Sequence, residues 1–178
     1  MSPDIEIIGD GCAALSLAAR ASELNHNIRL IKPSNAPTTN DHVWGFWSDP
    51  ILAAAQQLAR ATWQKWAIIT HNDCAVLSSE TRPYNAFKRS DWSEHCKGLA
   101  ELSKVTIIAE HEWEKSADSL LFDTRPPVVP NDCMLQHFQG IEVKTKQPCF
   151  DKDMAILMDF RVDPVSYTHL TLPTTLSV

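Results

Sequence analysis

The sequence contains no long apolar run and no cluster of basic residues. Nothing in its 178 residues approaches the ~18 consecutive apolar residues of a membrane-spanning helix. No basic segment followed by an apolar core marks a secretory signal peptide. The formal net charge is −6, whereas nucleic-acid-binding surfaces need clustered lysine and arginine. These absences predict a cytoplasmic chain without a nucleic-acid partner.

Cysteine pairs and glycine are also scarce. The five cysteines are scattered, odd in number and without C-x-x-C spacing, so we expect reduced thiols and no metal site. Only five glycines occur, fewer than the ~7% typical of proteins. Two of them, Gly9 and Gly11, stand close together near the start. This concentration of glycines indicates a tight turn near the start of the chain.

The two glycines belong to a Gly-x-Gly-x-x-Ala motif that directly follows the apolar run Ile5–Ile8. In a dinucleotide-binding turn, the first glycine allows a tight bend and the second lets a pyrophosphate approach the backbone. The alanine lets the following helix pack closely, and the helix N-terminus offers unpaired N–H groups to phosphates. The predicted cofactor contacts are therefore Gly9, Asp10, Gly11, Cys12, Ala13 and Ala14. The alternative is an ordinary glycine turn in some other α/β protein.

The context of the motif fits a βαβ unit. Small and apolar residues recur at helical spacing from Ala14 to Leu24, and Asn25 can end a helix in the left-handed conformation. A second strand follows at Ile28–Ile31. Dinucleotide-binding folds carry an acid ~20 residues after the glycines, where this chain has Lys32. Because lysine cannot accept a hydrogen bond from a ribose hydroxyl, we expect the adenosine end to be held differently or more weakly, with Lys32 as a candidate cofactor contact.

The middle of the chain continues the α/β pattern. We expect a hairpin excursion over 63–79, a helix from Ser90 to about Leu102, a strand over Val105–Ala109 and a buried strand over Ser119–Asp123. Asp123 and Arg125 follow that last strand, where open α/β sheets bind ligands, and they are further candidate cofactor contacts. The alternative for the two residues is a surface ion pair of small energetic effect.

An aromatic cluster, Trp44-Gly45-Phe46-Trp47, stands in a stretch that we expect to be a loop, before a helix over Ile51–Ala61. Aromatic side chains of this size bury most of their surface in folded proteins. Two interpretations remain open: the cluster fills a small core, or it forms an aromatic wall beside a flat cofactor or an apolar substrate.

The later strands no longer alternate with helices. We expect one over Leu135–Thr145, bent at Gly140, and another over Ala155–Val162. The predicted fold class is α/β, with a Rossmann-like dinucleotide-binding domain followed by the first strands of an antiparallel layer that is not completed. The corresponding ranges are 1–130, which includes the hairpin excursion, and 131–163.

Five segments of the chain resemble lycopene β-cyclases in order and approximate spacing. They are the glycine turn, the Trp44–Trp47 cluster, Phe122-Asp123-Thr124-Arg125, the stretch Gln136–Val143 and Leu157-Met158-Asp159-Phe160-Arg161. The resemblance covers residues Asp4 to about Asp163. It implies the fold of these carotenoid-forming flavoproteins, which belong to a larger group that also includes geranylgeranyl reductases and aromatic hydroxylases. By this resemblance, 1–130 is a Rossmann-like FAD-binding domain and 131–163 holds the first antiparallel strands of a truncated substrate domain.

The resemblance also implies a function. Lycopene cyclases bind FAD and work with it reduced, with NAD(P)H as a possible reductant. They protonate an end of the polyene, close the ring through a carbocation and release a proton, without net redox change. The substrate implies peripheral membrane contact by the full-length enzyme. The family's acidic Phe-x-Glu-type motif is not found here, so no catalytic residue is assigned.

Two other functions remain open: a redox flavoenzyme of the same fold, and a non-catalytic nucleotide-binding module. The residues from Pro164 to Val178 include no Asp, Glu, Lys or Arg, and a DNA sequence that would encode most of them resembles a transposase adapter used for sequencing libraries. We interpret 164–178 as a non-native tail, the alternative being a genuine threonine-rich tail. The chain alone is then expected to be an inactive, aggregation-prone N-terminal fragment.

Overall fold

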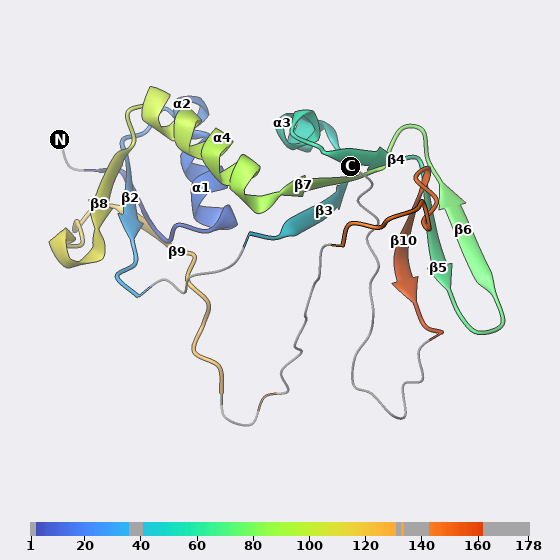
Figure 1. Ribbon diagram of the computed structural model, residues 1–178. Coiled ribbons are helices and arrows are strands. Elements are labelled where there is room, and N and C mark those ends of the chain that lie inside the picture. Colours follow the sequence, from blue (N-terminus) through green and yellow to red (C-terminus); the bar gives the residue numbers. More distant parts are fainter. Residues whose placement is uncertain (1–2, 36–40, 131–132, 134–142, 162–178) are drawn as a thin grey trace. The chain divides into compact units, whose positions relative to one another are not determined.

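A computed structural model describes residues 3–35, 41–130, 133 and 143–161 (Figure 1). The chain divides into two compact units, each made of two separate segments. The first unit consists of Met1–Asp41 and Arg89–Met134, and the second of His42–Lys88 and Leu135–Val178. The second unit is therefore inserted, in part, into the sequence of the first.

The first unit contains a parallel sheet of four strands in the order β8-β2-β1-β9. These strands are β1 (Ile5–Ile8), β2 (Ile28–Lys32), β8 (Thr106–Ala109) and β9 (Leu120–Asp123). The parallel sheet with its helices confirms the predicted α/β class and Rossmann-like architecture. The strand order reverses at β1, because β2 and β8 lie on one side of it and β9 on the other.

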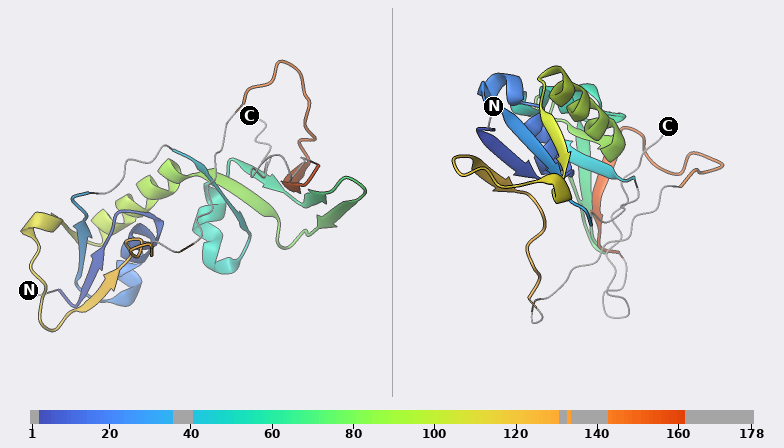
Figure 2. Two further views of the ribbon diagram at one scale, coloured as in Figure 1. Left: turned by 90° about the horizontal axis from the view of Figure 1, so that it is seen from below. Right: turned by 90° about the vertical axis from the view of Figure 1, so that its left-hand side faces the viewer.

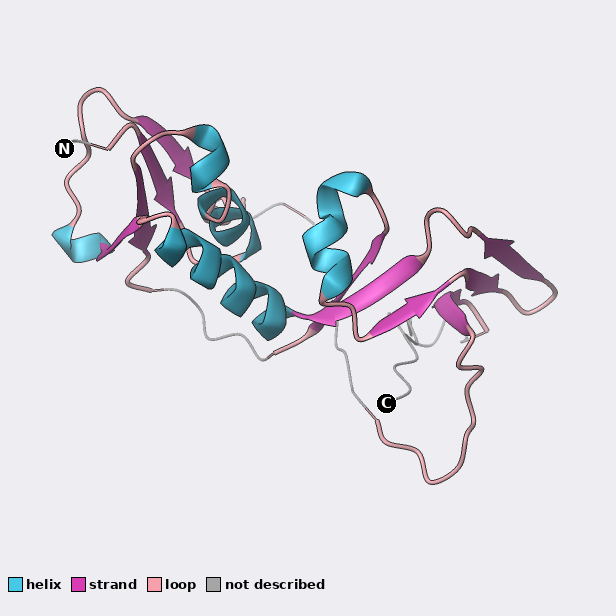
Figure 3. Ribbon diagram, turned by 90° about the horizontal axis from the view of Figure 1, so that it is seen from above, coloured by secondary structure: helices cyan, strands magenta, loops and turns pink. Residues whose placement is uncertain are grey.

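Three helices pack against this sheet: α1 (Cys12–Ala18), α2 (Ala21–Leu24) and α4 (Arg89–Leu102). Figure 3 shows them grouped beside the strands of their unit. Asn25 ends α2 with a left-handed φ of 52°, as its side chain allows. The core between helices and sheet is made of small and aliphatic side chains, including Ile7, Ala14, Leu15, Ala18, Leu30, Cys96 and Ala100.

The other face of β1 carries a buried carboxylate. Glu6 is fully buried and accepts hydrogen bonds from the Trp113 indole at 3.0 Å, the Ser116 amide at 3.2 Å and the Ser119 hydroxyl at 2.6 Å. The Arg29 guanidinium lies 3.3 Å away on β2. Burial raises the pKa of Glu6, but the three hydrogen bonds and the positive charge outweigh it, so the pKa lies below its ordinary value. Glu6 thus fastens the connection between β8 and β9 onto the sheet.

The second unit contains two sheets of three strands, β3-β7-β4 and β10-β5-β6. Figure 2 gives two further views of these strands. Their bounds are β3 (Val43–Trp47), β4 (Ala61–Trp63), β5 (Lys65–Ile69), β6 (Cys74–Ser78), β7 (Tyr84–Lys88) and β10 (Met154–Asp159). A 3₁₀ turn at Pro50–Leu52 and the short helix α3 (Ala53–Gln57) join β3 to β4. Buried Trp63, Ala86 and Ala155 form the centre of this unit.

The last described strand differs from its expected orientation. β10 pairs parallel with β5, whereas an antiparallel layer was expected; β5 and β6 form the expected antiparallel hairpin. A parallel neighbour needs a long crossover connection, and the chain between β5 and β10 supplies one. The same pairing places 42–88 in one unit with the later strands, whereas the sequence-based division included them in 1–130.

Three local expectations were wrong. The aromatic cluster forms the strand β3 rather than a loop, because Val43–Trp47 pairs antiparallel with β7. The helix expected over Ile51–Ala61 is shorter, since Ala61 already belongs to β4. The strand β9 is largely exposed rather than buried, because β1 is its one neighbour in the sheet formed by the described residues.

Two sequence-based expectations fall largely or wholly outside the described residues. The strand expected over Leu135–Thr145 falls mostly on residues that the structure does not describe, as does Val162. The tail over 164–178 lies entirely outside them.

Candidate functional site

The candidate site lies at the carboxyl ends of β1 and β9, where the strand order reverses. Open α/β sheets bind their ligands at such a switch point. The glycine turn follows β1, and the segment Asp123-Thr124-Arg125 lies at the end of β9. Ile8 and Asp123 are direct partners in the register of the two strands, so the structure brings both predicted segments together.

Gly9 meets two requirements that other residues cannot satisfy. Its φ is +141°, a conformation that L residues rarely adopt. A Cβ at this position would overlap the Thr124 hydroxyl and lie 3.2 Å from the Ala14 Cβ. Thr124 is itself fixed, because its amide and its hydroxyl both donate to the Ile8 carbonyl at 2.9 Å. The glycine therefore allows β1, β9 and α1 to meet closely.

Gly11 is different, because space is open around it. It precedes α1 in an extended conformation, with φ −85° and ψ −172°, and no side chain caps the first turn of the helix. A Cβ built on Gly11 meets no atom within 4 Å. Cys12 and Ala13 are exposed, whereas Ala14 is fully buried and packs in the core. The start of α1 thus presents backbone N–H groups beside open space, which suits an anionic ligand.

The predicted residues Asp123 and Arg125 form part of a larger charged chain. The Arg125 guanidinium donates to the Asp123 carboxylate at 2.9 Å and, through Nη1, to Glu110 Oε1 at 2.8 Å. Glu110 Oε2 in turn accepts from the Ser34 amide at 2.9 Å. The hydrogen bonds from the Arg125 side chain hold the pKa of Asp123 below its ordinary value, so this carboxylate is ionised at neutral pH. The Asp–Arg pair exists, and its role toward a cofactor stays a prediction.

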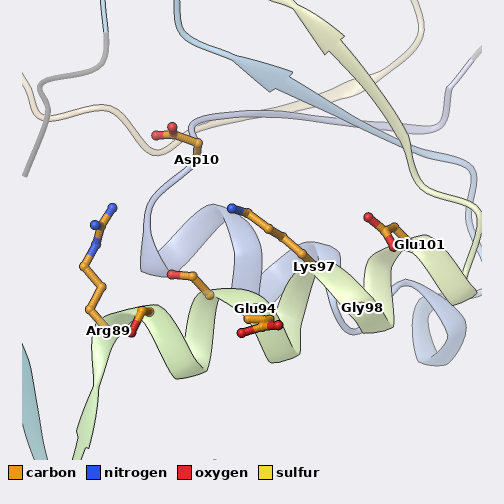
Figure 4. A pocket seen from close by; sticks show the side chains of 8 residues that line it. Asp10, Arg89, Glu94, Lys97, Gly98 and Glu101 are labelled. Carbon is orange, nitrogen blue, oxygen red and sulfur yellow. The ribbon is translucent and has the colours of Figure 1, made fainter. Parts of the chain in front are cut away.

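Two cations that the sequence interpretation missed lie beside the glycine turn. A cavity of about 640 Å³ is lined by Asp10 and by residues of α4, among them the cations Arg89 and Lys97 and the carboxylates Glu94 and Glu101. Figure 4 shows the Arg89 and Lys97 side chains extending from α4 toward the side on which Asp10 lies. Eight residues apart, they share one face of a helix. This spacing was the available signal, but the insertion between β2 and α4 separates both residues from the glycine motif in sequence.

Lys32 lies at the exposed end of β2, as predicted. Its register partner on β8 is Ala109, the residue before Glu110. The Glu110 carboxylate, which directly follows β8, therefore lies at the same end of the sheet as the Lys32 amine, which ends β2.

The aromatic strand β3 divides its side chains between two faces. Trp44 and Phe46 lie partly buried, edge-to-face with Phe87 of β7. Trp47 is 47% exposed and contacts Trp66 and Tyr84. The core interpretation fits the first pair, and an aromatic wall for a ligand stays a prediction for Trp47.

Asp159, at the end of β10, is not suited to donate a proton. Hydrogen bonds from Arg161, including one of 2.8 Å from its Nε, lower the pKa of Asp159 to about 2. Within the described residues, no three His, Cys, Asp or Glu side chains are grouped as metal ligands. The helices of the described ranges include none with the length and apolar character to cross a bilayer.

Comparison with known proteins gives one match of broad extent. The sequence profile of a family described as lycopene cyclase protein matches residues 4–176. No curated protein matches the chain significantly.

Solved structures that match part of the chain include a tetrameric 2-methyl-3-hydroxypyridine-5-carboxylic acid oxygenase. It has 18% identity and a TM-score of 0.47 over 59% of this chain and 30% of its own. CtdE in complex with FAD and substrate has 14% identity and a TM-score of 0.45, and the match covers 61% of this chain and 30% of CtdE. PqsL of P. aeruginosa in complex with 2-aminobenzoylacetate has 9% identity and a TM-score of 0.49, and the match covers 61% of this chain and 33% of PqsL. The chain thus spans about a third of the length of these structures.

Proposed function

The chain belongs to the lycopene cyclase family, and on that premise we propose that it forms the FAD-binding part of a lycopene β-cyclase. The proposed reaction closes the ends of linear lycopene into β-ionone rings without net oxidation or reduction. The observation that supports the cofactor most directly is the glycine turn at the point where the sheet order reverses.

The residues of the turn fit a dinucleotide. The open space at Gly11 would admit a pyrophosphate, and the uncapped start of α1 would donate to it. Arg89 and Lys97 of α4 would attract it, against the repulsion of Asp10, Glu94 and Glu101 in the same lining, so the backbone N–H groups are the main argument for the fit. When bound and reduced, FAD would supply a flat anionic ring that stabilises a carbocation. We propose NAD(P)H as the source of the reducing electrons.

Two described acids at strand ends, Asp123 and Asp159, are poor candidates for the proton donor. Asp123 and Asp159 are each paired with an arginine that favours the ionised form. A general acid needs a pKa near the working pH, so both are poor donors. We place the acid outside the described residues, and the described units supply cofactor binding and part of the substrate enclosure.

The proposed substrate sets the proposed location. Lycopene is a C40 hydrocarbon that dissolves in the bilayer rather than in water, so the enzyme must reach the membrane surface to take it up. We propose a cytoplasmic enzyme with peripheral membrane contact.

Expression of the longer protein that contains this chain, in cells that accumulate lycopene, tests the proposal. The expected result is conversion of lycopene to products with β-ionone rings, and loss of conversion in Gly11→Val. Lycopene that persists beside soluble, flavin-loaded protein would contradict a cyclase. Hydrogenated or hydroxylated products would instead identify a redox flavoenzyme.

A further inference from the structure

A dinucleotide site needs an acceptor for the ribose hydroxyls of adenosine. In this fold class, an acid at the end of the second strand provides it. Here that position is Lys32, whose ammonium group can only donate. Some other group must accept from the ribose, or the adenosine end is held without this contact.

The neighbouring strand brings a carboxylate to the same edge of the sheet. Glu110 directly follows β8, whose last residue Ala109 is the register partner of Lys32. Its Oε2 accepts from the Ser34 amide at 2.9 Å, two residues beyond Lys32. This hydrogen bond fixes the carboxylate against the backbone that continues β2.

A second contact orients the same carboxylate toward the switch point. Glu110 Oε1 accepts from Arg125 at 2.8 Å, and Arg125 follows β9 on the far side of β1. The carboxylate is therefore held between segments that follow β2 and β9. A fixed carboxylate loses little conformational freedom when a ligand binds.

The carboxylate retains capacity for a ligand. A carboxylate has about four lone-pair directions, and its hydrogen bonds to residues that the structure describes occupy two of them. The Glu110 side chain is 29% exposed, so a ligand can reach it.

We propose that Glu110 accepts a hydrogen bond from a ribose hydroxyl of the bound adenine dinucleotide, in place of the acid that β2 lacks. This inference rests on the proposed nucleotide binding and names the ligand group that the site recognises. Glu110 is then a binding residue for an adenine ribonucleotide with an unmodified ribose.

The test measures affinities of the 178-residue chain for ADP, 2′-deoxy-ADP and 3′-deoxy-ADP by calorimetry, at low concentration with the monomer content checked. A hydrogen bond to a charged acceptor makes a difference of about tenfold or more in affinity. We therefore expect ADP to bind about tenfold more tightly than one of the deoxy analogues. In Glu110→Ala this preference should vanish, with little change for the analogue that lacks the hydroxyl.

Measuring each ligand against both the wild type and Glu110→Ala forms a double-mutant-type cycle, which separates a direct contact with the ribose from a purely structural role of Glu110. Loss of a structural contact would weaken all three ligands by a similar factor and would overturn the inference. Glu110→Gln keeps the shape and one acceptor oxygen, so we expect it to fold as the wild type and to show a reduced preference. Glu112→Gln is the matched control, because this glutamate of the same turn bonds the Ala109 amide instead and should leave the preference unchanged.

Other outcomes are also decisive. An unchanged preference in Glu110→Ala overturns the role of Glu110 while leaving nucleotide binding intact. Tighter binding of NADP⁺ than of NAD⁺ overturns it as well, because a 2′-phosphate beside a carboxylate is disfavoured and would point to Lys32. Failure of the folded chain to bind any of the nucleotides overturns both this inference and the proposed cofactor.

Discussion

The Ser119 hydroxyl donates a hydrogen bond of 2.6 Å to the fully buried carboxylate of Glu6, across 113 residues of sequence. Together with Trp113 and Arg29, it makes Glu6 a fixed point between β1 and the segment before β9. We predict that Glu6→Ala lowers the free energy of unfolding by about 3 kcal/mol, because it leaves buried donors and a positive charge without their acceptor. Urea unfolding followed by tryptophan fluorescence measures this loss.

The control for that measurement is a glutamate on the surface. Glu23 pairs with Arg20 at 2.7 Å, but both side chains are about half exposed. We expect Glu23→Ala to cost under about 1 kcal/mol. Equal effects of the two substitutions would contradict the role assigned to Glu6.

Glu6 also predicts a dependence of stability on pH. Its pKa is lower in the folded chain than its ordinary value of 4.5, so the unfolded chain binds the proton more readily. The stabilisation is therefore complete above about pH 4.5 and is lost as the pH falls through the folded pKa. We expect the unfolding free energy to fall less steeply below pH 4.5 in Glu6→Gln than in the wild type. Parallel curves would show that other groups cause the acid sensitivity.

Gly9→Ala should destabilise the first unit. The added Cβ overlaps the Thr124 hydroxyl, and alanine rarely adopts a φ of +141°. We predict a loss of more than about 2 kcal/mol in unfolding free energy. In a Thr124→Ala background the overlap is removed and the backbone strain remains, so the cost should shrink without vanishing. A cost that is the same in both backgrounds would argue against the contact.

Gly11→Val should leave stability nearly unchanged and abolish nucleotide binding. Its extended conformation and the open space around it accommodate a side chain, so we expect the unfolding free energy to change by less than about 0.5 kcal/mol. The branched side chain would occupy the space proposed for the pyrophosphate and should abolish binding of ADP or FAD. Calorimetry measures the nucleotide affinity, and denaturation of the same preparation measures the unfolding free energy. Wild-type affinity in the variant would contradict the assignment.

The exposed strand β9 predicts self-association of the 178-residue chain. Leu120 is 65% exposed and Phe122 44% exposed on this strand, which has β1 as its one neighbour among the described strands. A strand with an open edge pairs readily with other chains. We expect Leu120→Lys to reduce aggregation, measured by sedimentation at increasing concentration, while unfolding near the wild-type midpoint. Asp118→Lys changes charge just before the strand without removing apolar surface, and it should reduce aggregation less.

Elements specified by neighbouring residues were predictable from the sequence. The strand, glycine turn, helix and second strand between Ile5 and Ile31 depend on local apolar spacing and on residues such as Gly9 and Asn25 that permit unusual backbone angles. The position of Asp123 and Arg125 near the glycine turn was also predictable, because the carboxyl ends of parallel strands lie at a common edge of the sheet.

Features specified by distant pairing were not predictable. Val43–Trp47 looks like a loop until β7 provides hydrogen bonds for it. The buried state of Glu6 depends on donors more than a hundred residues away. Glu110 and Lys97 could not be predicted as neighbours of the candidate site. The insertion of 42–88 separates them from the glycine turn, and no short spacing rule links residues across it.

The pairing of β1 with both β2 and β9 sets an order of events during protein synthesis. Ile5 leaves the ribosome early, but its register partner Leu120 follows on the order of 10 seconds later at common rates of translation. Over that interval the buried carboxylate of Glu6 has no Ser119 and no Trp113, and residues 42–88 emerge between the two halves of the sheet. The edge of nascent β1 that later pairs with β9 is therefore open to a chaperone throughout this interval, whereas its β2 edge can pair early.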